Sequence, residues 1–162
     1  MDRRVIGLVA FGGALLVVVV IVLIAQGGDD SDGGSTVADA GEKPTVEVPE
    51  GPPPTELQIE DLESGSGDEA TTGDQVSVQY VGVLYDTGEE FDSSWDRGEP
   101  FQFQLGSGQV IPGWDQGVVG MKVGGRRQLI IPPDLAYGAQ GYPPDIPPDA
   151  TLIFDIDLKK IG

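Results

Sequence analysis

The chain begins with an uninterrupted apolar run. Residues 5–25 are 21 positions without a charged side chain, and Arg3 and Arg4 precede them. A helix of that length spans about 31 Å, close to the thickness of the hydrocarbon layer of a bilayer. We therefore predict a transmembrane signal anchor over 5–25. Residues 1–4 would be cytoplasmic, and everything after residue 25 would lie outside the cytoplasm.

A cleaved signal peptide is the alternative interpretation of this run, because secretory signals also join basic residues to an apolar stretch. The apolar part of such signals usually has about 7–15 residues. The run at 5–25 is longer and ends in Leu-Ile-Ala, which matches the usual cleavage pattern poorly. A retained anchor is favoured, with secretion after cleavage as the alternative.

Four later segments alternate apolar and polar positions with a period of two, which is typical of β-strands. They lie around residues 76–80, 101–105, 127–131 and 152–158. One short helix is expected around 113–118, directly after Pro112. Several strands and a single helix predict an α+β domain in which an antiparallel sheet curls over the helix.

The segment between the apolar run and these strands differs in composition. Residues 26–54 contain six Gly, five Pro and seven acidic residues, and no aromatic residue. Such a stretch buries too little apolar surface to offset the entropy of ordering it, so we predict a disordered acidic linker. Residues 55–162 hold ten of the eleven aromatic residues and form the predicted folded domain.

Composition excludes several kinds of chemistry. The chain has no Cys and no His, which removes thiol nucleophiles and the commonest metal ligand and general base. A formal net charge of −18 argues against nucleic acid as a partner. We expect no metal and no cofactor.

The sequence Leu-Tyr-Asp-Thr-Gly at 84–88 is similar to the aspartic-protease signature, in which two Asp carboxylates share a proton. Those proteases follow the glycine with Ala or Ser, whereas Glu89 and Glu90 follow here. Asp86 and Gly88 also suit an ordinary hairpin turn. A protease-like dimer that uses Asp86 is a remote alternative.

Several aromatic residues stand where a small core does not require them. Trp114 lies at the start of the expected helix, and Tyr137 and Tyr142 lie in Gly/Pro-rich loop sequence. Loop side chains seldom belong to the core and more often contribute to binding. These positions indicate an apolar binding pocket.

Seven segments, in order, resemble the FKBP-type peptidyl-prolyl cis-trans isomerases, the macrolide-binding immunophilins. They are residues 78–82, 91–94, 100–101, 110–114, 136–138, 146–148 and 151–154. The similarity runs through most of 55–162 and fits a minimal single-domain member. It implies a five- to six-stranded antiparallel sheet wrapped around one short helix, with a pocket between helix and sheet.

The resemblance also implies the residues of the site. Those expected to be catalytic are Asp92, Tyr137, Trp114, Phe91 and Phe154. Those expected to bind substrate are Tyr80, Phe101, Gln109, Val110, Ile111, Tyr142 and Ile146. Within this set, Trp114 resembles the pocket floor, Asp92 and Tyr137 the polar rim, and Ile146 part of an overhanging loop.

The implied activity is cis-trans isomerisation of X–Pro bonds during protein folding outside the cytoplasm. It would need no covalent chemistry. Implied partners are proline-containing polypeptides, macrolide inhibitors and, through the N-terminal helix, the membrane; the small domain is expected to be monomeric. The alternative to an enzyme is a membrane-tethered FKBP-like module that binds or chaperones polypeptides without catalysing isomerisation.

Overall fold

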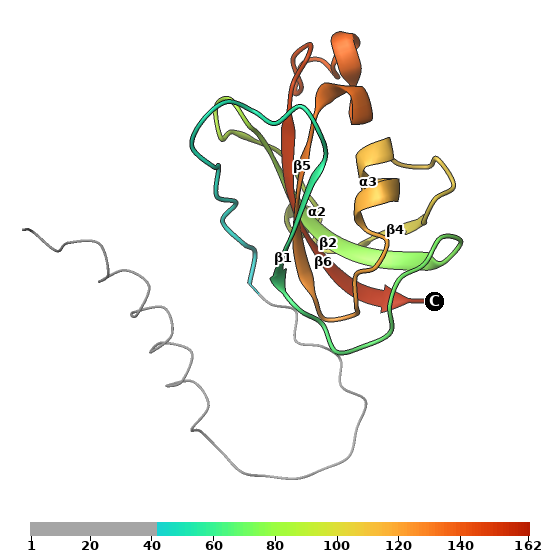
Figure 1. The fold of residues 1–162 in the computed structure, drawn as a ribbon. Coiled ribbons are helices and arrows are strands. Elements are labelled where there is room, and N and C mark those ends of the chain that lie inside the picture. Colours follow the sequence, from blue (N-terminus) through green and yellow to red (C-terminus); the bar gives the residue numbers. More distant parts are fainter. Residues whose placement is uncertain (1–41) are drawn as a thin grey trace, which may run out of the picture. The chain divides into compact units, whose positions relative to one another are not determined.

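The computed structural model describes residues 42–162, which belong to one compact unit (Figure 1). The predicted anchor at 5–25 and the first part of the predicted linker lie outside the described residues. None of the helices within 42–162 is long and apolar enough to cross a membrane.

The central feature is a six-stranded antiparallel sheet, as predicted (Figure 1). Its strands are β1 (Gln58–Glu63), β2 (Gln75–Leu84), β3 (Glu90–Ser93), β4 (Phe101–Gln104), β5 (Arg126–Ile131) and β6 (Leu152–Ile161). Their order is β1-β5-β6-β2-β3, and β4 pairs with the first half of β2. Because β3 pairs with the second half of β2, these two short strands follow one another along the same edge.

Helical segments are short. The helix α3 (Pro112–Gly117) forms where the sequence predicted it, with proline in its first turn. A single-turn helix α2 (Ser94–Arg97) follows β3, and two 3₁₀ turns occupy Pro133–Leu135 and Gly138–Gln140. In Figure 1, α3 lies against one face of the sheet, which we call the inner face.

Alternation along the strands sorts their side chains onto the two faces. Leu129, Leu152 and Phe154 belong to the core beneath α3, whereas Ile130 and Ile153 belong to a second apolar cluster. This second cluster defines the outer face. The sequence indicated half-buried strands, yet every residue of β6 from Leu152 to Leu158 is buried, so the outer face is covered as well.

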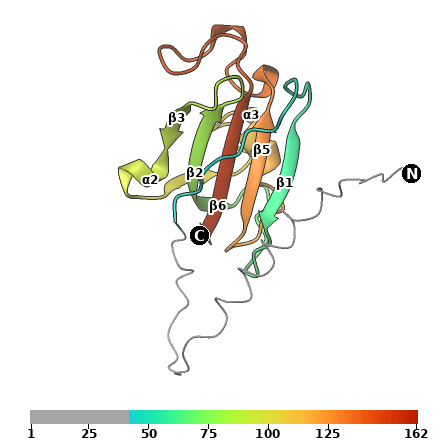
Figure 2. The same cartoon turned by 90° about the vertical axis from the view of Figure 1, so that its left-hand side faces the viewer.

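Residues 42–54 provide part of that cover. They contain no helix or strand, but Figure 2 shows them crossing in front of β2 and β6, and Val46 packs on the outer cluster. This differs from the disordered linker predicted for these residues. The composition of this segment carries no information about long-range contacts such as that of Val46.

The strands β1 and β3 were not predicted. All six residues of β1 are exposed, so buried and exposed positions do not alternate along it. β3 has only four residues, which is too short for a clear pattern. Each of them pairs on one side with a mostly buried strand, β1 with β5 and β3 with β2, and that pairing determines their conformation.

Candidate functional site

Close contact between α3 and β5 determines where Trp114 lies. A Cβ atom built on Gly113 would stand 2.5 Å from Cγ2 of Ile131, and one on Gly117 would stand 2.6 Å from Cδ1 of Leu129. Only glycine at both positions lets the helix approach the strand this closely. Trp114 is 4% exposed and contributes to the inner core from the first turn of α3.

The Trp114 indole is the centre of an aromatic cluster. Its ring centroid lies 4.9 Å from that of Tyr80 and 5.2 Å from that of Phe154, both in edge-to-face geometry. Phe91 also meets Phe154 edge-to-face, at 5.5 Å. Gly82 makes room for this pair, because a Cβ there would lie 2.7 Å from atoms of both rings. Such geometry aligns the positive edge of one ring with the negative face of the next.

These rings surround a cavity of about 440 Å³. Its lining residues come from β2, β3, β4, β6, α3 and the loops beside them: Tyr80, Phe91, Asp92, Phe101, Gly108, Gln109, Val110, Ile111, Trp114, Tyr137 and Phe154. The site is therefore mostly apolar, with a few polar groups, as is common for small-molecule and peptide pockets.

The polar part of the lining is an ion-paired network. The Tyr80 hydroxyl donates to Oδ2 of Asp92 at 2.5 Å. Arg97 donates from Nη1 to Oδ1 of Asp92 at 2.6 Å and from Nη2 to the Tyr80 hydroxyl oxygen at 2.7 Å. Each carboxylate oxygen of Asp92 therefore accepts one charge-assisted or phenolic hydrogen bond, which defines the orientation of this carboxylate.

The two phenols of the lining are neutral near pH 7. Burial, followed by the hydrogen bond to Asp92, raises the pKa of Tyr80 to about 12. Burial raises the pKa of Tyr137 too, with smaller contributions from the Asp92 carboxylate and Tyr142. Both hydroxyls can consequently act as hydrogen-bond donors over the physiological pH range.

A buried serine joins the rim to the sheet. Ser94, the first residue of α2, accepts a hydrogen bond from the Tyr80 backbone N–H at 2.7 Å and donates to the side chain of Gln79. This contact ties the β3–α2 segment, which carries Asp92 and Arg97, to the middle of β2.

Ten of the twelve residues predicted for the site line this cavity. The other two do not. Tyr142 is 62% exposed and its ring lies 5.6 Å from that of Tyr137, outside the lining. Ile146 is 3% exposed and belongs to the inner core, while its backbone pairs with that of Tyr142. The loop predicted to overhang the pocket thus points its isoleucine inward.

Sequence reasoning missed Gly108, Ser94 and Arg97. Arg97 had one usable signal, since it is the only basic residue between Lys43 and Lys122. Its partners Asp92 and Tyr80 lie 5 and 17 positions away, and neither spacing matches a helix or strand repeat.

Asp86 is not among the residues that line the cavity. It is exposed in the turn between β2 and β3, where the Gly88 N–H donates to the Leu84 carbonyl and Gly88 has a φ of 70°. This is the hairpin turn that competed with the protease interpretation. The positive φ accounts for the glycine without any catalytic role.

A curled antiparallel sheet, the short helix α3 and an aromatic cavity between them define a compact α+β domain built around an apolar binding site. Residues 67–159 match the family described as FKBP-type peptidyl-prolyl cis-trans isomerase. The chain belongs to this family, and the domain is accordingly an isomerase of the FKBP type.

Two relatives show how far the similarity extends. An FK506-binding protein of Streptomyces anulatus is 62% identical over 121 residues, which cover 74% of this chain and 98% of that protein. A probable FK506-binding protein of Corynebacterium glutamicum is 55% identical over 117 residues, covering 72% and 97%. Both matches are longer than residues 55–162, so each includes positions before Thr55.

A solved structure supports the fold directly. The crystal structure of AtFKBP13 is similar with a TM-score of 0.62 and 42% sequence identity, over 65% of this chain and 93% of that one. The similarity in fold and the similarity in sequence therefore indicate the same family.

Proposed function

We propose that the domain accelerates rotation about X–Pro peptide bonds by binding the twisted amide in the aromatic cavity, without forming a covalent bond. The planar amide resists rotation by about 18–20 kcal/mol because its C–N bond has partial double-bond character. That resonance, and the charge separation it carries, is lost when the bond twists. An apolar wall therefore favours the twisted amide over the planar one.

The observation that carries this proposal is the composition of the cavity lining. Aromatic and aliphatic side chains form most of it, and Trp114 is one of them. In the proposal, Trp114 is the group that contacts the prolyl ring. A reduction of the barrier by about 5 kcal/mol would raise the rate roughly 5,000-fold. No nucleophile or titrating base is needed for such a step.

The polar groups have an orienting role in this proposal. Asp92 is held by Tyr80 and Arg97, so its carboxylate presents a defined acceptor to the backbone N–H groups of a bound peptide. The Tyr137 hydroxyl, which donates to no group within residues 42–162, is available to a peptide carbonyl. Neither group transfers a proton in the step.

The test is an isomerisation assay on the full chain with short X–Pro peptides, with and without a macrolide of the FK506 type. We expect isomerisation that the macrolide inhibits. Asp86→Asn is the control and should isomerise at the wild-type rate. A chain that binds the macrolide but leaves the peptide rate at its uncatalysed value would instead be a binding module, and the catalytic proposal would be rejected.

The same assay gives a prediction about pH. The chain has no His or Cys, and the elevated pKa values of Tyr80 and Tyr137 leave both phenols protonated well above pH 8. We expect kcat/KM to change by less than about twofold between pH 6 and 8, since the proposed step transfers no proton and both phenols stay protonated there. A bell-shaped profile in this window would indicate proton transfer and contradict the proposed step.

We also propose that the domain acts outside the cytoplasm, held by the apolar segment 5–25. The support is the charge-free run of 21 residues preceded by Arg3 and Arg4. We expect the protein in the membrane fraction at full mass, with the domain released by protease added to the outside. Recovery of a soluble form that lacks residues 1–25 would support secretion after cleavage instead.

A further inference from the structure

Residues 42–54, called the strap from here on, cross the outer face of the sheet on the side opposite α3 (Figure 2). Val46 is the apolar contact of the strap. It packs on the outer cluster, which consists of Val81, Val83, Tyr85, Ile130 and Ile153. These residues come from β2, β5, β6 and the turn after β2, so a single strap residue touches a cluster built from the centre of the sheet.

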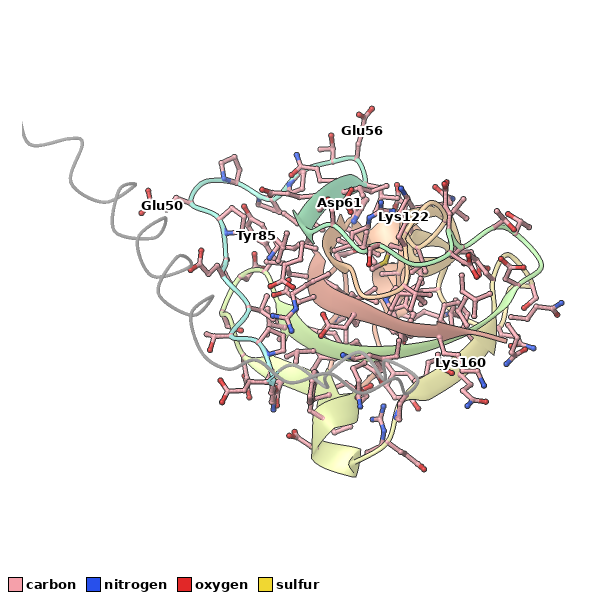
Figure 3. All side chains as sticks on the ribbon, turned by 90° about the horizontal axis from the view of Figure 1, so that it is seen from below. Glu50, Glu56, Asp61, Tyr85, Lys122 and Lys160 are labelled. Carbon is pink, nitrogen blue, oxygen red and sulfur yellow. The ribbon has the colours of Figure 1, made fainter. Side chains whose placement is uncertain are left out.

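Polar contacts follow the strap along its length. Arg126 and Gln128 of β5 donate to the carbonyl oxygens of Glu42 and Glu47, each at 3.4 Å. The Tyr85 hydroxyl donates to the Pro52 carbonyl at 3.3 Å, and Figure 3 shows Tyr85 beside the segment that carries Glu50. These bonds are long and individually weak. Together they connect both ends of the strap to the sheet.

The strap also reaches the segment that forms the cavity rim. Lys43 Nζ lies 2.8 Å from a carboxylate oxygen of Glu90, at the start of β3, and 2.8 Å from one of Asp96, in α2. Hydrogen bonds to Asp96 and Glu90 raise the pKa of Lys43, so it is fully charged at neutral pH.

The two partners of Lys43 bracket the rim residues in the chain. Phe91 and Asp92 lie between Glu90 and Asp96, and Arg97 follows Asp96 directly. Phe91 and Asp92 line the cavity, and Arg97 holds Asp92 by the 2.6 Å ion pair. One ammonium group of the strap therefore joins the two ends of the short segment that carries Phe91 and Asp92.

The region aligned with the Streptomyces relative extends into the strap. The match to the Streptomyces relative spans 74% of the 162 residues, about 120 positions, and so begins at or before residue 43. A stretch that served only as a spacer would be free to vary in sequence and in length. The inclusion of strap residues in the aligned region agrees with the strap being a part of the domain.

We propose that the strap is a working part of the isomerase domain, with Lys43 as a positioning residue that holds the β3–α2 segment and so sets Asp92 at the cavity rim. Lys43 does not touch the cavity. This inference rests on the proposed function for the role of Asp92 in orienting a bound peptide. The contacts of the strap do not depend on that function.

The test compares the full chain with three variants. Lys43→Met keeps the aliphatic stem and removes the charge, and Lys43→Arg restores a cation. Lys160→Met is the matched control, because Lys160 is exposed and has no ion pair among the described residues (Figure 3). KM and kcat for one X–Pro peptide are measured for each protein, with the thermal midpoint as a check on folding.

We expect Lys43→Met to raise KM roughly two- to fivefold with kcat nearly unchanged, since partly exposed ion pairs contribute modestly. A group that orients the peptide equally in ground and transition states affects KM rather than kcat. Lys43→Arg and Lys160→Met should match the wild type. In 1 M NaCl the wild-type KM should rise toward that of Lys43→Met, because the Debye length falls to about 3 Å.

Two results would overturn the proposal: equal KM values for Lys43→Met and Lys160→Met, or failure of Lys43→Arg to restore the wild-type KM. If the wild-type chain does not isomerise the peptide at all, the proposed function is refuted instead. In that case the Kd of the same peptide, followed by tryptophan fluorescence, replaces KM. The same ratios between variants then decide the role of Lys43.

Discussion

Phe103→Ala is expected to lower the free energy of unfolding by about 3–5 kcal/mol. Phe103 is 1% exposed and sits on β4 opposite Val76 of β2. Its ring stacks on Phe101 at 5.8 Å and meets Trp114 at 5.6 Å. Truncation leaves a void beneath both rings, which the short strand β4 can close only in part.

The size of this loss is a large share of the stability of a small domain, which is typically about 5–15 kcal/mol. Thermal unfolding should show it as a fall in midpoint of roughly 10–20 °C. Gln102→Ala is the control, because Gln102 neighbours Phe103 on the same strand and is exposed. Equal midpoints for the two variants would show that the core does not depend on Phe103.

Trp114→Leu is expected to lower kcat/KM for X–Pro peptides by about 10- to 100-fold, equivalent to about 1.4–2.7 kcal/mol of transition-state stabilisation. The indole lines the cavity and meets the rings of Tyr80 and Phe154. Leucine fills part of this volume, so the domain should remain folded. It cannot reproduce the flat aromatic surface against a prolyl ring.

The second tryptophan of the chain gives a matched control. Trp95 packs against the outer cluster, on the face away from the cavity. Trp95→Leu should cost some stability and leave kcat/KM near the wild-type value. If Trp114→Leu lowers the thermal midpoint while kcat/KM per folded molecule stays unchanged, Trp114 is a core residue and another group forms the base of the site.

The strap affects how the domain should be produced for such experiments. A fragment that starts at Thr55 would lack Val46 and Lys43 and would uncover the outer cluster. Asp155 lies on this face too, 3% exposed, with its pKa raised chiefly by burial. Fragments should therefore begin at or before residue 42, because both apolar surface and a buried carboxylate depend on this cover.

Much of the architecture could be predicted from local patterns. Alternation of Leu152, Phe154 and Ile156 with their neighbours identified β6, and Pro112 located the start of α3. The aromatic residues of the cavity could be predicted through the resemblance to a family, and ten of the twelve site residues line it. Such signals are local, because each depends on residues a few positions apart or on short segments in a fixed order.

Local patterns in the sequence were sufficient for the class of fold, and composition alone removed thiol and imidazole chemistry. The aromatic residues also indicated the apolar character of the site. Three contacts became visible once the chain was folded: Arg97 meets Tyr80 and Asp92, Ile146 packs in the core, and Lys43 joins β3 to α2. Strand periodicity separates the two faces of a sheet, but it does not indicate which segments cover either face. Those contacts depend on distances between segments far apart in the chain, which exist only once the sheet has formed.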